Sequence, residues 1–556
     1  MANVRTLYNF NGGVHPPQHK EESTGRPIAQ APIPSHLIIP VHQHIGNAAK
    51  PLIAVGDSVL KGQMIAQAEG YVSASVHAPT SGMITAIDMQ TVPHPSGLPD
   101  LCITLKPDGE DRWIEHKPLN YREMDLSALR NRLRDAGVVG LGGAVFPSFI
   151  KLNPGPKQKI QTLILNGAEC EPWITCDDML MRERADEIVE GIEIMRFLLR
   201  PEEVLIGIED NKPEAIAAMR EACSKTHFPI EVVPVPTLYP GGGAKQLIKV
   251  LTNQEPPSGG RSTDIGVQCF NVATAYSVHR AVNHGEPVIS RIVTVTGNVR
   301  RPQNFEVLIG TPVKELVALT GTPREDTNHY IMGGPMMGFD LPSDKAPAVK
   351  ATNCIIAAAP ALFPPAATPM QCIRCGRCAQ ACPADLQPQE LYWFSRAKNF
   401  GKAQEYSLFD CIECGCCSYV CPSHIPLVQY YRFAKSEIWA REKEKNAADL
   451  ARERHEFRQH RLDREKQERA EKLALKAAAK TAPAAVAGSA ETVSSADSEA
   501  AAKKAVIQAA LERAKAKKAG VAPKNVDNLP PEKLKEIQEI EARRAKIREM
   551  VQKDNV

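Results

Sequence analysis

One cysteine pattern constrains this chain more than any other feature, and it occurs twice between Cys372 and Pro422. Each copy has the form Cys-x-x-Cys-x-x-Cys-x-x-x-Cys-Pro, starting at Cys372 and again at Cys411. Three thiolates at this spacing can bind one corner of an iron–sulfur cubane, while the fourth, which precedes proline, binds a different cluster. The pattern therefore predicts a module that holds two [4Fe-4S] clusters.

The spacing divides the eight cysteines into two sets of ligands. We assign Cys372, Cys375, Cys378 and Cys421 to one cluster, and Cys411, Cys414, Cys417 and Cys382 to the other. Zinc sites and disulfides are the alternatives, but zinc knuckles use two CxxC pairs and lack the CxxxCP segment. Cys416 is out of register, and we interpret it as a bystander. A cluster carries one electron at a time. Other parts of the chain must therefore supply electrons to the two clusters and accept electrons from them.

The composition limits the compartment and the partners that suit these clusters. The 556 residues suggest about three to five domains, and the net charge of +3 gives no argument for nucleic-acid binding. The cysteines outside the two runs are scattered without a pairing pattern, which favours a reducing compartment. The opening residues lack the apolar segment of a signal peptide, and no window reaches the roughly 18 apolar residues of a membrane span. We expect a soluble or peripheral protein on the cytoplasmic side.

The first part of the chain is predicted to be a lead followed by a β domain. Residues 1–30 are polar and rich in Gly, Pro and His, and we interpret them as an extended lead. Residues 31–110 contain short alternating strands with turn residues. Residues 55–63 and 77–84 resemble the barrel-sandwich fold of biotinyl and lipoyl domains, which carry a cofactor on a hairpin lysine. Because no lysine occurs between Lys61 and Lys106, we expect a structural or docking barrel.

Residues 111–285 alternate between helical and strand patterns. Leu126, Leu129 and Leu133 recur at helical spacing. Strands are expected at 162–165, 204–208 and 230–235, with helices at about 178–199 and from Pro213. This alternation predicts a Rossmann-like parallel sheet that is covered on both faces. Ligands of such sheets bind at the carboxyl ends of the strands, where the segment from Asn166 to Glu171 lies.

A glycine-rich loop at residues 137–147 precedes the first of these strands. Glycines lack Cβ atoms, so backbone N–H groups can approach a phosphate or a flat ring. Such a loop alone is equally compatible with a tight turn. Glu169 and Glu171 are either solvated loop residues or acceptors for a ribityl or ribose hydroxyl or a ring N–H. Their position beside the loop and a strand end favours the second interpretation.

Together these motifs resemble the NADH- and FMN-binding subunit of respiratory complex I and its hydrogenase relatives. The shared pattern is Gly140-x-Gly142-Gly143-Ala144-x-Phe146-Pro147, Lys151, Asn166-x-x-Glu169-x-Glu171-Pro172, Tyr239-Pro240-Gly241-Gly242-Gly243 and Asn271-Val272-Ala273-Thr274. The resemblance implies FMN contacts by Gly140, Gly142, Gly143, Asn166, Glu169, Glu171, Tyr239, Gly242, Asn271 and Thr274. It further implies nucleotide contacts by Phe146 and Lys151. No side chain is assigned as a catalytic acid or base.

The chain also departs from that family at several positions. An arginine and two glycines of the family are replaced by Leu141, Val145 and Trp173. Acidic residues of the family are replaced by Ala168, Gly243 and Ala244. The departures concern the nicotinamide side of the expected site more than the flavin side.

Residues 286–350 begin with alternating β-forming residues and resemble the small β-grasp domain that follows the flavin domain in complex I. Met336 and Met337 lie in the Gly333–Gly338 turn, and we interpret them as core filler. A proline-rich linker at 360–369 leads into the ferredoxin module, which we place at 351–433.

Residues 434–556 form a charged tail that is rich in Ala, Glu, Lys and Arg. A solvated helix is predicted at 440–480, followed by a disordered low-complexity segment at 481–501.

The order of these parts resembles the RnfC family of the Rnf (Rsx) ion-translocating electron-transport complexes, from about Phe10 to Phe433. The doubled ferredoxin run distinguishes this order from the complex I protein, which has one cluster. The resemblance implies a multidomain α/β fold. Its parts are a barrel-sandwich domain, a Rossmann-like parallel α/β flavin domain, a β-grasp domain, an α-helical two-cluster ferredoxin module and a charged helical or disordered tail.

The same resemblance implies a peripheral subunit at the cytoplasmic face of the bacterial inner membrane. We expect it to pass electrons between NAD(H) and ferredoxin, or another low-potential carrier, through FMN and two [4Fe-4S] clusters. It would act as part of an NADH:ferredoxin-type oxidoreductase whose other subunits, membrane-embedded and peripheral, couple the flow to ion translocation. The alternative is a non-enzymatic iron–sulfur carrier and docking subunit that does not oxidise NADH, which the departures at Leu141, Val145, Gly243 and Ala244 support.

Overall fold

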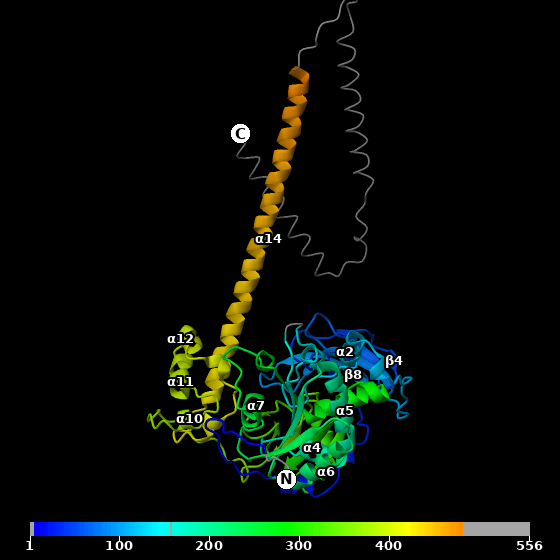
Figure 1. Ribbon diagram of the computed structural model, residues 1–556, viewed down its shortest axis with the longest axis vertical. Helices are drawn as coiled ribbons and strands as arrows, with labels where there is room; N and C mark the ends of the chain where they lie inside the picture. The colour runs from blue at the N-terminus through cyan, green and yellow to red at the C-terminus, as the bar shows by residue number, and fades with distance from the viewer. Residues whose placement is uncertain (1–4, 156–157, 322, 482–556) are drawn as a thin grey trace, which may run out of the picture. The chain divides into compact units, whose positions relative to one another are not determined.

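Four β-sheets organise the described part of the chain up to Leu450 (Figure 1). The structure, a computed structural model, describes residues 5–155, 158–321 and 323–481. Residues up to Leu450 form one unit, and a second unit begins at Ala451.

Two small antiparallel sheets form the domain predicted at residues 31–110. Their orders are β2–β8–β7–β4 and β3–β5–β6. The strands are β2 (Leu37–Pro40), β3 (Lys50–Pro51), β4 (Ser58–Val59), β5 (Met64–Gln67), β6 (Val76–His77), β7 (Gly82–Thr91) and β8 (Pro99–Pro107). Leu37 and Ile103 from the first sheet and Ile65 from the second are fully buried in one shared core. The alternating sequence pattern is explained by this core, because alternate side chains of a strand point to opposite faces.

A four-stranded parallel sheet with the order β11–β10–β9–β12 forms the centre of the predicted flavin domain. The strands are β9 (Thr162–Asn166), β10 (Glu203–Glu209), β11 (Ile230–Val235) and β12 (Val267–Asn271). Leu163 and Leu165 of β9 join one apolar core, and Ile164 joins another, so both faces of the sheet are covered. Strand β12 was not predicted; it lies beside β9 and places Asn271 opposite Asn166.

Helices cover the two faces of this sheet. They are α2 (Leu126–Asp135), α3 (Ser148–Lys151), α4 (Cys176–Glu183), α5 (Ala185–Leu199), α6 (Pro213–Ser224), α7 (Ala244–Thr252) and α8 (Val272–His279), with short turns η1 (Tyr121–Glu123), η2 (Ser262–Ile265) and η3 (Arg280–His284). The prediction of one helix at about 178–199 is wrong, because the helix breaks at Arg184 (φ −131°, ψ 31°). Both helices pack against α6, but α5 packs mainly against α8, whereas α4 also packs against strand β13 (Ser290–Gly297).

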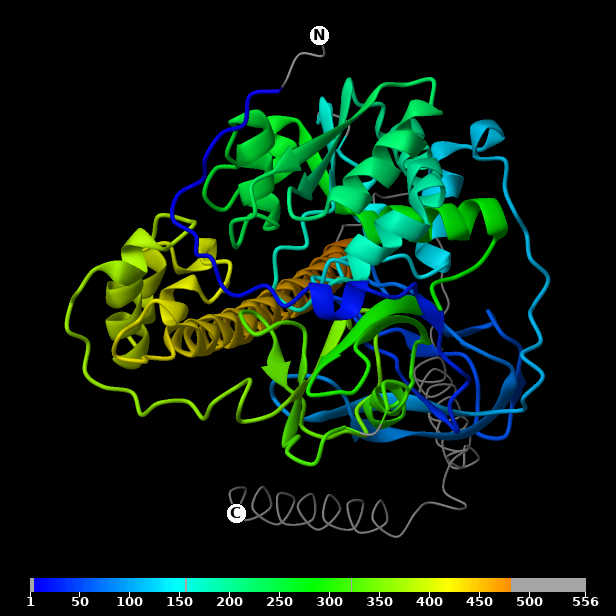
Figure 2. The same ribbon diagram turned by 90° about the horizontal axis from the view of Figure 1, so that it is seen from below.

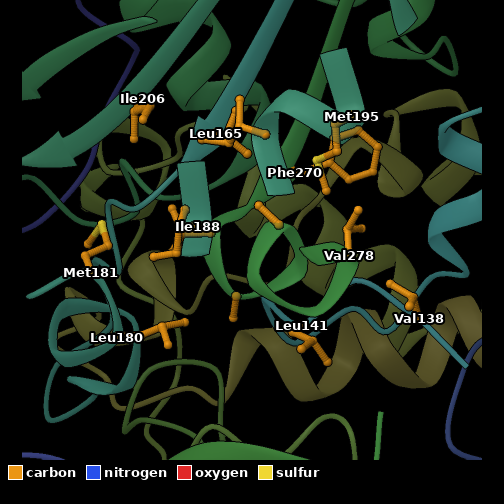
Figure 3. Packing of buried hydrophobic residues seen from close by; sticks show 14 of the residues in the cluster. Val138, Leu141, Leu165, Leu180, Met181, Ile188, Met195, Ile206, Phe270 and Val278 are labelled. Atoms are coloured by element: carbon orange, nitrogen blue, oxygen red, sulfur yellow. The ribbon is translucent and has the colours of Figure 1, made fainter. Parts of the chain in front are cut away.

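The larger apolar core lies between the sheet and helices α5 and α8 (Figure 3). Leu165 and Phe270 come from adjacent strands, while Ile188 of α5 and Val278 of α8 pack into the same cluster. Leu141, from the glycine-rich loop, belongs to it as well. The loop is therefore anchored to the domain by its own apolar residue.

A six-stranded mixed sheet with the order β1–β14–β13–β17–β15–β16 forms the next part of the chain. Besides β13 it contains β1 (Ala29–Gln30), β14 (Gln303–Leu308), β15 (His329–Met332), β16 (Phe339–Asp340) and β17 (Cys354–Ala358), with helix α9 (Val313–Ala318) in sequence after β14. Strands β13 and β14 form an antiparallel pair, and β17 is parallel to β13. The predicted extended lead contributes β1, which is parallel to β14, and the short helix α1 (Glu21–Thr24).

The interpretation of Met336 and Met337 as core filler is wrong for Met337, which is 44% exposed. Both residues lie in the turn between β15 and β16. Their backbone N–H groups donate to Glu171 Oε1 at 2.7 and 3.0 Å. The turn is therefore held through its backbone rather than through buried methionine side chains.

Short helices surround the cysteine runs. They are α10 (Arg377–Gln380), α11 (Pro388–Arg396), α12 (Phe400–Glu405), η4 (Leu408–Asp410) and α13 (Cys416–Tyr419). The long helix α14 (Leu427–Thr481) completes the core of this module, since Tyr431, Ala434 and Ile438 are buried in it. The boundary predicted between residues 433 and 434 falls inside this one continuous helix.

From residue 440 to 477 nearly all side chains of α14 are exposed. Ion pairs one turn apart, such as Arg461 with Glu465 at 3.8 Å, lie along this stretch. This agrees with the solvated helix predicted at 440–480. The predicted disordered segment at 481–501 lies, apart from its first residue, outside the described residues.

Candidate functional site

The eight cysteines of the two runs line two separate cavities in the module. Cys382, Cys411, Cys414 and Cys417 line one cavity, here called the inner site. Cys372, Cys375, Cys378 and Cys421 line the other, here called the outer site. Each cavity receives three cysteines from one run and the fourth from the other run. The structure thus brings together the same two sets that the spacing predicts.

The two cysteine loops have the same backbone conformation. Arg374 and Glu413 occupy equivalent positions and have φ values of 55° and 59°. Gly376 and Gly415 follow with φ values of 76° and 81°, and each caps the short helix that carries the third cysteine. The identical spacing of the runs therefore produces two equivalent cradles.

The donor set of the inner site fits an iron–sulfur cluster. Four thiols converge among apolar residues, and backbone N–H groups of Leu386 and Glu413 lie 3.4 Å from the sulfurs of Cys382 and Cys411. Burial raises the pKa of Cys411 to about 11. Because burial disfavours the thiolate of Cys411, a positively charged metal centre would favour the ionised form that ligates metal.

The two sites differ in their exposure. Cys414 and Cys417 of the inner site are each only 7% exposed. In the outer site Cys375 is exposed, and the adjacent Ile373 is 68% exposed. The outer site therefore faces solvent, while the inner site is enclosed by protein.

Loops of the flavin domain and the mixed sheet contact the inner site directly. The hydroxyl of Tyr239, in the loop before α7, donates to the carbonyl oxygen of Cys414 at 2.6 Å. Tyr239 is almost fully buried, and burial raises its pKa. An added Cβ at Gly415 would lie 2.7 Å from the carbonyl oxygen of Met336, which shows how closely the turn approaches. These contacts join the predicted flavin site to one cluster site.

The glycine-rich loop lies at the carboxyl ends of strands β9 and β12. Leu141 N–H donates to Thr274 Oγ1 at 3.0 Å, and Gly142 packs against Asn271. The backbone of Gly142, Gly143 and Ala144 is exposed, and a Cβ built on Gly143 would meet no atom within 4 Å. A ligand can therefore approach this backbone closely, as a flavin phosphate or ring would require.

A buried arginine of the mixed sheet supports the glycine-rich loop through its backbone. Arg291 of β13 is 6% exposed and donates to the carbonyl oxygen of Leu141 at 3.1 Å. Leu141 itself points into the apolar core. The guanidinium at this loop therefore comes from the neighbouring sheet, and the sequence contains no local signal for it.

Two of the replaced glycines keep a backbone conformation that suits glycine. Val145 has φ 43° and Trp173 has φ 71°. The left-handed region is unfavourable for residues with a side chain, and most of all for a β-branched one. Both loops therefore contain a strained non-glycine residue.

The two acids in the loop after β9 accept hydrogen bonds from the protein. Glu169 accepts from the N–H groups of Asp177 at 2.7 Å and Asp178 at 3.2 Å, at the start of α4. Glu171 accepts from the turn that contains Met336. Burial raises the pKa of both glutamates and raises that of Asp177 to about 7. Both acids therefore fix the shape of this loop.

The two asparagines at the strand ends also hold backbone in place. Asn166 Nδ2 donates to the carbonyl oxygen of Gly242 at 2.7 Å. Asn271 Nδ2 donates to Asp177 Oδ2 at 2.5 Å, and its Oδ1 accepts from Ala273 N–H. Asn166 therefore ties its strand end to the loop that contains Gly242, and Asn271 ties its strand end to the start of α4.

The two predicted nucleotide contacts differ in how accessible they are. Phe146 is half-buried, and its backbone oxygen accepts from Gly140 N–H at 2.8 Å. Lys151 donates to the carbonyl oxygen of Cys269, and its Nζ lies 4.4 Å from the centroid of Phe270. Phe146 thus borders the loop surface, whereas the ammonium of Lys151 is engaged with β12.

Lys20, in the lead, is a site residue that sequence reasoning missed. Its ammonium donates to the carbonyl oxygens of Glu169, Glu171 and Ile174 at 2.8, 2.9 and 2.6 Å. Lys20 is 7% exposed, and burial lowers its pKa. No sequence signal marks it, because the lead is polar throughout and far from this loop along the chain.

Four family models match successive parts of the chain. They are the RnfC barrel sandwich hybrid domain at residues 8–110, the Nuo51 FMN-binding domain at 133–280, the SLBB domain at 292–340 and the 4Fe-4S dicluster domain at 371–425. These matches confirm a multidomain chain with a barrel-sandwich domain, a flavin domain and a two-cluster module.

Curated relatives match over most of the chain. The C subunit of the ion-translocating oxidoreductase complex (RnfC) of Yersinia pestis bv. Antiqua (strain Antiqua) is 50% identical over 462 residues, which are 83% of this chain and 74% of the relative. The chain belongs to this RnfC family. The relative from Serratia proteamaculans (strain 568), which has the same name, is 48% identical over 475 residues, 84% of this chain and 67% of the relative. The resemblance to this family that the sequence predicts is confirmed.

Among solved structures, the chain is similar to an NAD+-reducing [NiFe]-hydrogenase in the H2-reduced state. The TM-score is 0.41 at 17% sequence identity, over 54% of this chain and 61% of that chain.

As a member of the RnfC family, the chain is an oxidoreductase subunit that acts as part of a complex. Its cofactors are FMN and two [4Fe-4S] clusters. Within residues 5–155, 158–321 and 323–481, no helix combines the length and the hydropathy needed to cross a membrane.

Proposed function

We propose that this subunit passes electrons between NAD(H) and ferredoxin, or another low-potential carrier, at the cytoplasmic face of the bacterial inner membrane. When bound, FMN exchanges a hydride with nicotinamide and single electrons with the clusters. Other subunits of the complex, membrane-embedded and peripheral, would couple this transfer to ion translocation. The observation that carries the proposal is the contact of Tyr239 and the Met336 turn with the inner site.

The proposed FMN contacts gather at one edge of the parallel sheet. They are Gly140, Gly142, Gly143, Asn166, Glu169, Glu171, Tyr239, Gly242, Asn271 and Thr274. The exposed glycine backbone supports this assignment, as does the pairing of Asn166 with Asn271 at adjacent strand ends. Tyr239 would also link the flavin loop to the inner site through its hydroxyl group.

The burial of the two cysteine sites supports an order for them. The inner site lies against the flavin-domain loops, so we propose that its ligands hold the cluster nearer to the flavin. The outer site opens at Cys375 and Ile373, so its ligands would hold the cluster that meets the next carrier. In this arrangement the protein itself encloses the inner thiols and leaves the outer ones accessible.

An anaerobic NADH titration of the purified, cluster-containing protein tests the proposal. We expect flavin absorbance to bleach on addition of NADH and the iron–sulfur absorbance to fall after it. NADPH serves as a matched reductant for specificity. A preparation that holds flavin and iron but does not respond to NADH would overturn NADH oxidation.

The alternative function, a carrier and docking subunit without NADH oxidation, has one specific observation in its favour. Gly243 caps the start of α7 and Ala244 is exposed there, so this helix end offers no carboxylate where the family has two. The same titration separates the alternatives. In a carrier, NADH would reduce neither flavin nor clusters, whereas dithionite would still reduce the clusters.

Iron content tests the two ligand sets. Cys375→Ala should remove roughly half of the iron, because it removes one of four thiolates from one cluster only. Cys416→Ala should remove none, although Cys416 is fully buried beside Cys414. Iron loss from Cys416→Ala would show that the assigned register is wrong.

A further inference from the structure

An exposed tyrosine of the barrel-sandwich domain stands beside the glycine-rich loop. Tyr71 is 65% exposed, so most of its ring is free to contact a ligand. Its ring lies 6.2 Å from that of Phe149, at an interplanar angle of 77°. Phe149 is buried in α3, which follows directly after the loop. One side of the Tyr71 ring therefore contacts the buried Phe149 ring, and most of the remainder is exposed.

The loop that carries Tyr71 is fixed to the flavin domain at two points. Arg134 of α2 donates to the carbonyl oxygen of Gly70 at 2.7 Å, and its guanidinium lies 5.5 Å from the Phe149 ring. On the other side, Ile45 N–H donates to the carbonyl oxygen of Val145 at 3.4 Å. The position of Tyr71 relative to the glycine-rich loop is therefore set by hydrogen bonds between the two domains.

The segment around Ile45 connects Tyr71 to the strained end of that loop. Asn47 N–H donates to the carbonyl oxygen of Val72 at 2.9 Å, so the two barrel loops run side by side. Ile45 is 52% exposed, and Val145 and Phe146 are half-buried next to it along the loop. Tyr71, Ile45, Val145 and Phe146 form what we call the barrel-side wall. This wall continues the exposed backbone of Gly142 to Ala144 toward the barrel.

We propose that Tyr71 stacks on the adenine ring of NAD(H), so that the barrel-sandwich domain completes the dinucleotide site. This inference rests on the proposed function. A flat, exposed aromatic ring can cover a purine, and aromatic side chains supply large contact area at a low cost in conformational entropy. Gly142 packs on Asn271 at the strand ends, where FMN is proposed to lie. Val145 instead contacts Ile45 of the barrel, so the barrel-side wall borders a different part of the loop from Asn271, which suits the adenosine half rather than nicotinamide.

Kinetics with three variants test the assignment. We expect Tyr71→Ala to raise the KM for NADH about tenfold while kcat with ferricyanide stays unchanged, since the lost stacking does not touch the reacting atoms. Tyr71→Phe keeps the ring and should behave like the wild type. Leu98→Ala, at an equally exposed apolar residue of the same domain (66% exposed), is the matched control and should change neither constant.

A binding measurement gives a readout that does not depend on turnover. ADP-ribose contains the adenosine half and lacks nicotinamide, so its dissociation constant for the cofactor-containing protein should rise about tenfold in Tyr71→Ala. The FMN and iron contents of the variant should equal those of the wild type. An unchanged KM and unchanged ADP-ribose binding would overturn the inference, as would FMN loss that accounts for the defect.

The two proposals can fail separately. If NADH does not reduce the wild-type flavin, the proposed function fails, and ADP-ribose binding alone decides the role of Tyr71. If NADH reduces the wild type and Tyr71→Ala equally well at all concentrations, NADH oxidation stands and the role of Tyr71 falls. In that case the exposed ring is left as a contact surface for another subunit.

Discussion

At the scale of single residues, the flavin-domain loops contain two non-glycine residues whose backbone angles favour glycine. Val145 and Trp173 have positive φ angles of 43° and 71°, which glycine adopts most readily. A non-glycine residue in this region costs about 1–3 kcal/mol, and such strain concentrates at ligand sites. Val145 is held in place by Ile45 of the barrel, whose N–H donates to its carbonyl oxygen. The barrel thus stabilises a loop conformation that the sequence of the loop disfavours.

Substitutions at Val145 should show this strain directly. Both Val145→Gly and Val145→Ala remove the branched side chain, but only glycine relieves the positive φ, so Val145→Gly should be more stable by about 1 kcal/mol. Val55, which is 59% exposed and has no positive φ, is the control. There alanine should be more stable than glycine by about 0.5–1 kcal/mol. Thermal unfolding of the four variants measures both differences, and the same order at both positions would contradict the interpretation.

A second prediction at this scale concerns acid stability. His77 of β6 is 6% exposed, and its Nδ1 has no hydrogen-bond partner among the described residues. Burial lowers its pKa to about 3, and the nearby charges of Lys350 and Arg132 act in the same direction. The folded state thus keeps His77 neutral where the unfolded chain takes up a proton, so stability is present above pH 6.5 and is lost as the pH falls toward 3.

Urea unfolding at about pH 7.5 and about pH 5.5 tests this contribution. Between these values the wild type should lose about 1.4 kcal/mol more unfolding free energy than His77→Leu, because only the wild type has this histidine to protonate on unfolding. Equal pH dependence of the two proteins would show that His77 does not contribute.

At the scale of elements, packing partners decide where helices begin and end. The pattern at residues 178–199 is helical throughout, yet the chain breaks at Arg184, and only α5 packs extensively on α8 while α4 reaches β13. The opposite occurs at α14, where a change in composition suggests a boundary but the helix continues. Its first turns carry Tyr431 and Ile438 into the module core, and Lys435 donates to the carbonyl oxygen of Cys411 at 2.7 Å. The beginning of α14 is therefore part of the inner cluster site.

Alanine substitutions in α14 should distinguish its buried first turns from its exposed continuation by their effects on stability and iron content. Ile438 is 4% exposed, so Ile438→Ala should cost about 2–5 kcal/mol and reduce iron retention by the module. Leu450 is 48% exposed, so Leu450→Ala should leave stability and iron content unchanged. Iron analysis and thermal unfolding of both variants provide the comparison. Equal effects would mean that α14 does not support the clusters.

At the scale of the unit up to Leu450, the lead connects parts that are far apart in the sequence (Figure 2). Gly13 N–H donates to the carbonyl oxygen of Ala381 beside the cysteine runs, at 3.1 Å. Val14 pairs with Tyr239, and Lys20 holds the loop that contains Glu169. Strand β1 then adds to the mixed sheet. The polar lead is therefore a structural link between the flavin loops and the cluster module.

Lys20→Met should weaken this link without removing the side-chain stem. Three carbonyl oxygens lose a charged donor, and hydrogen bonds to charged groups contribute about 1.5–3 kcal/mol each, so we expect a clear loss of stability and a lower flavin content. Lys159→Met, at a lysine whose side chain is 73% exposed, is the matched control and should change neither. Thermal unfolding and flavin absorbance measure the two effects. Normal flavin retention in Lys20→Met would contradict a role for the lead at the flavin loop.

The sequence by itself determined the features that depend on local spacing. The two cysteine runs specify two equivalent loops, and alternating strand and helix patterns specify a parallel sheet, because both depend on residues close together in the chain. Tertiary structure alone decided which distant residues support these motifs, such as Lys20, Arg291 and Tyr71. These residues carry no local pattern, since their roles arise from hydrogen bonds and ring contacts between segments that only folding brings together.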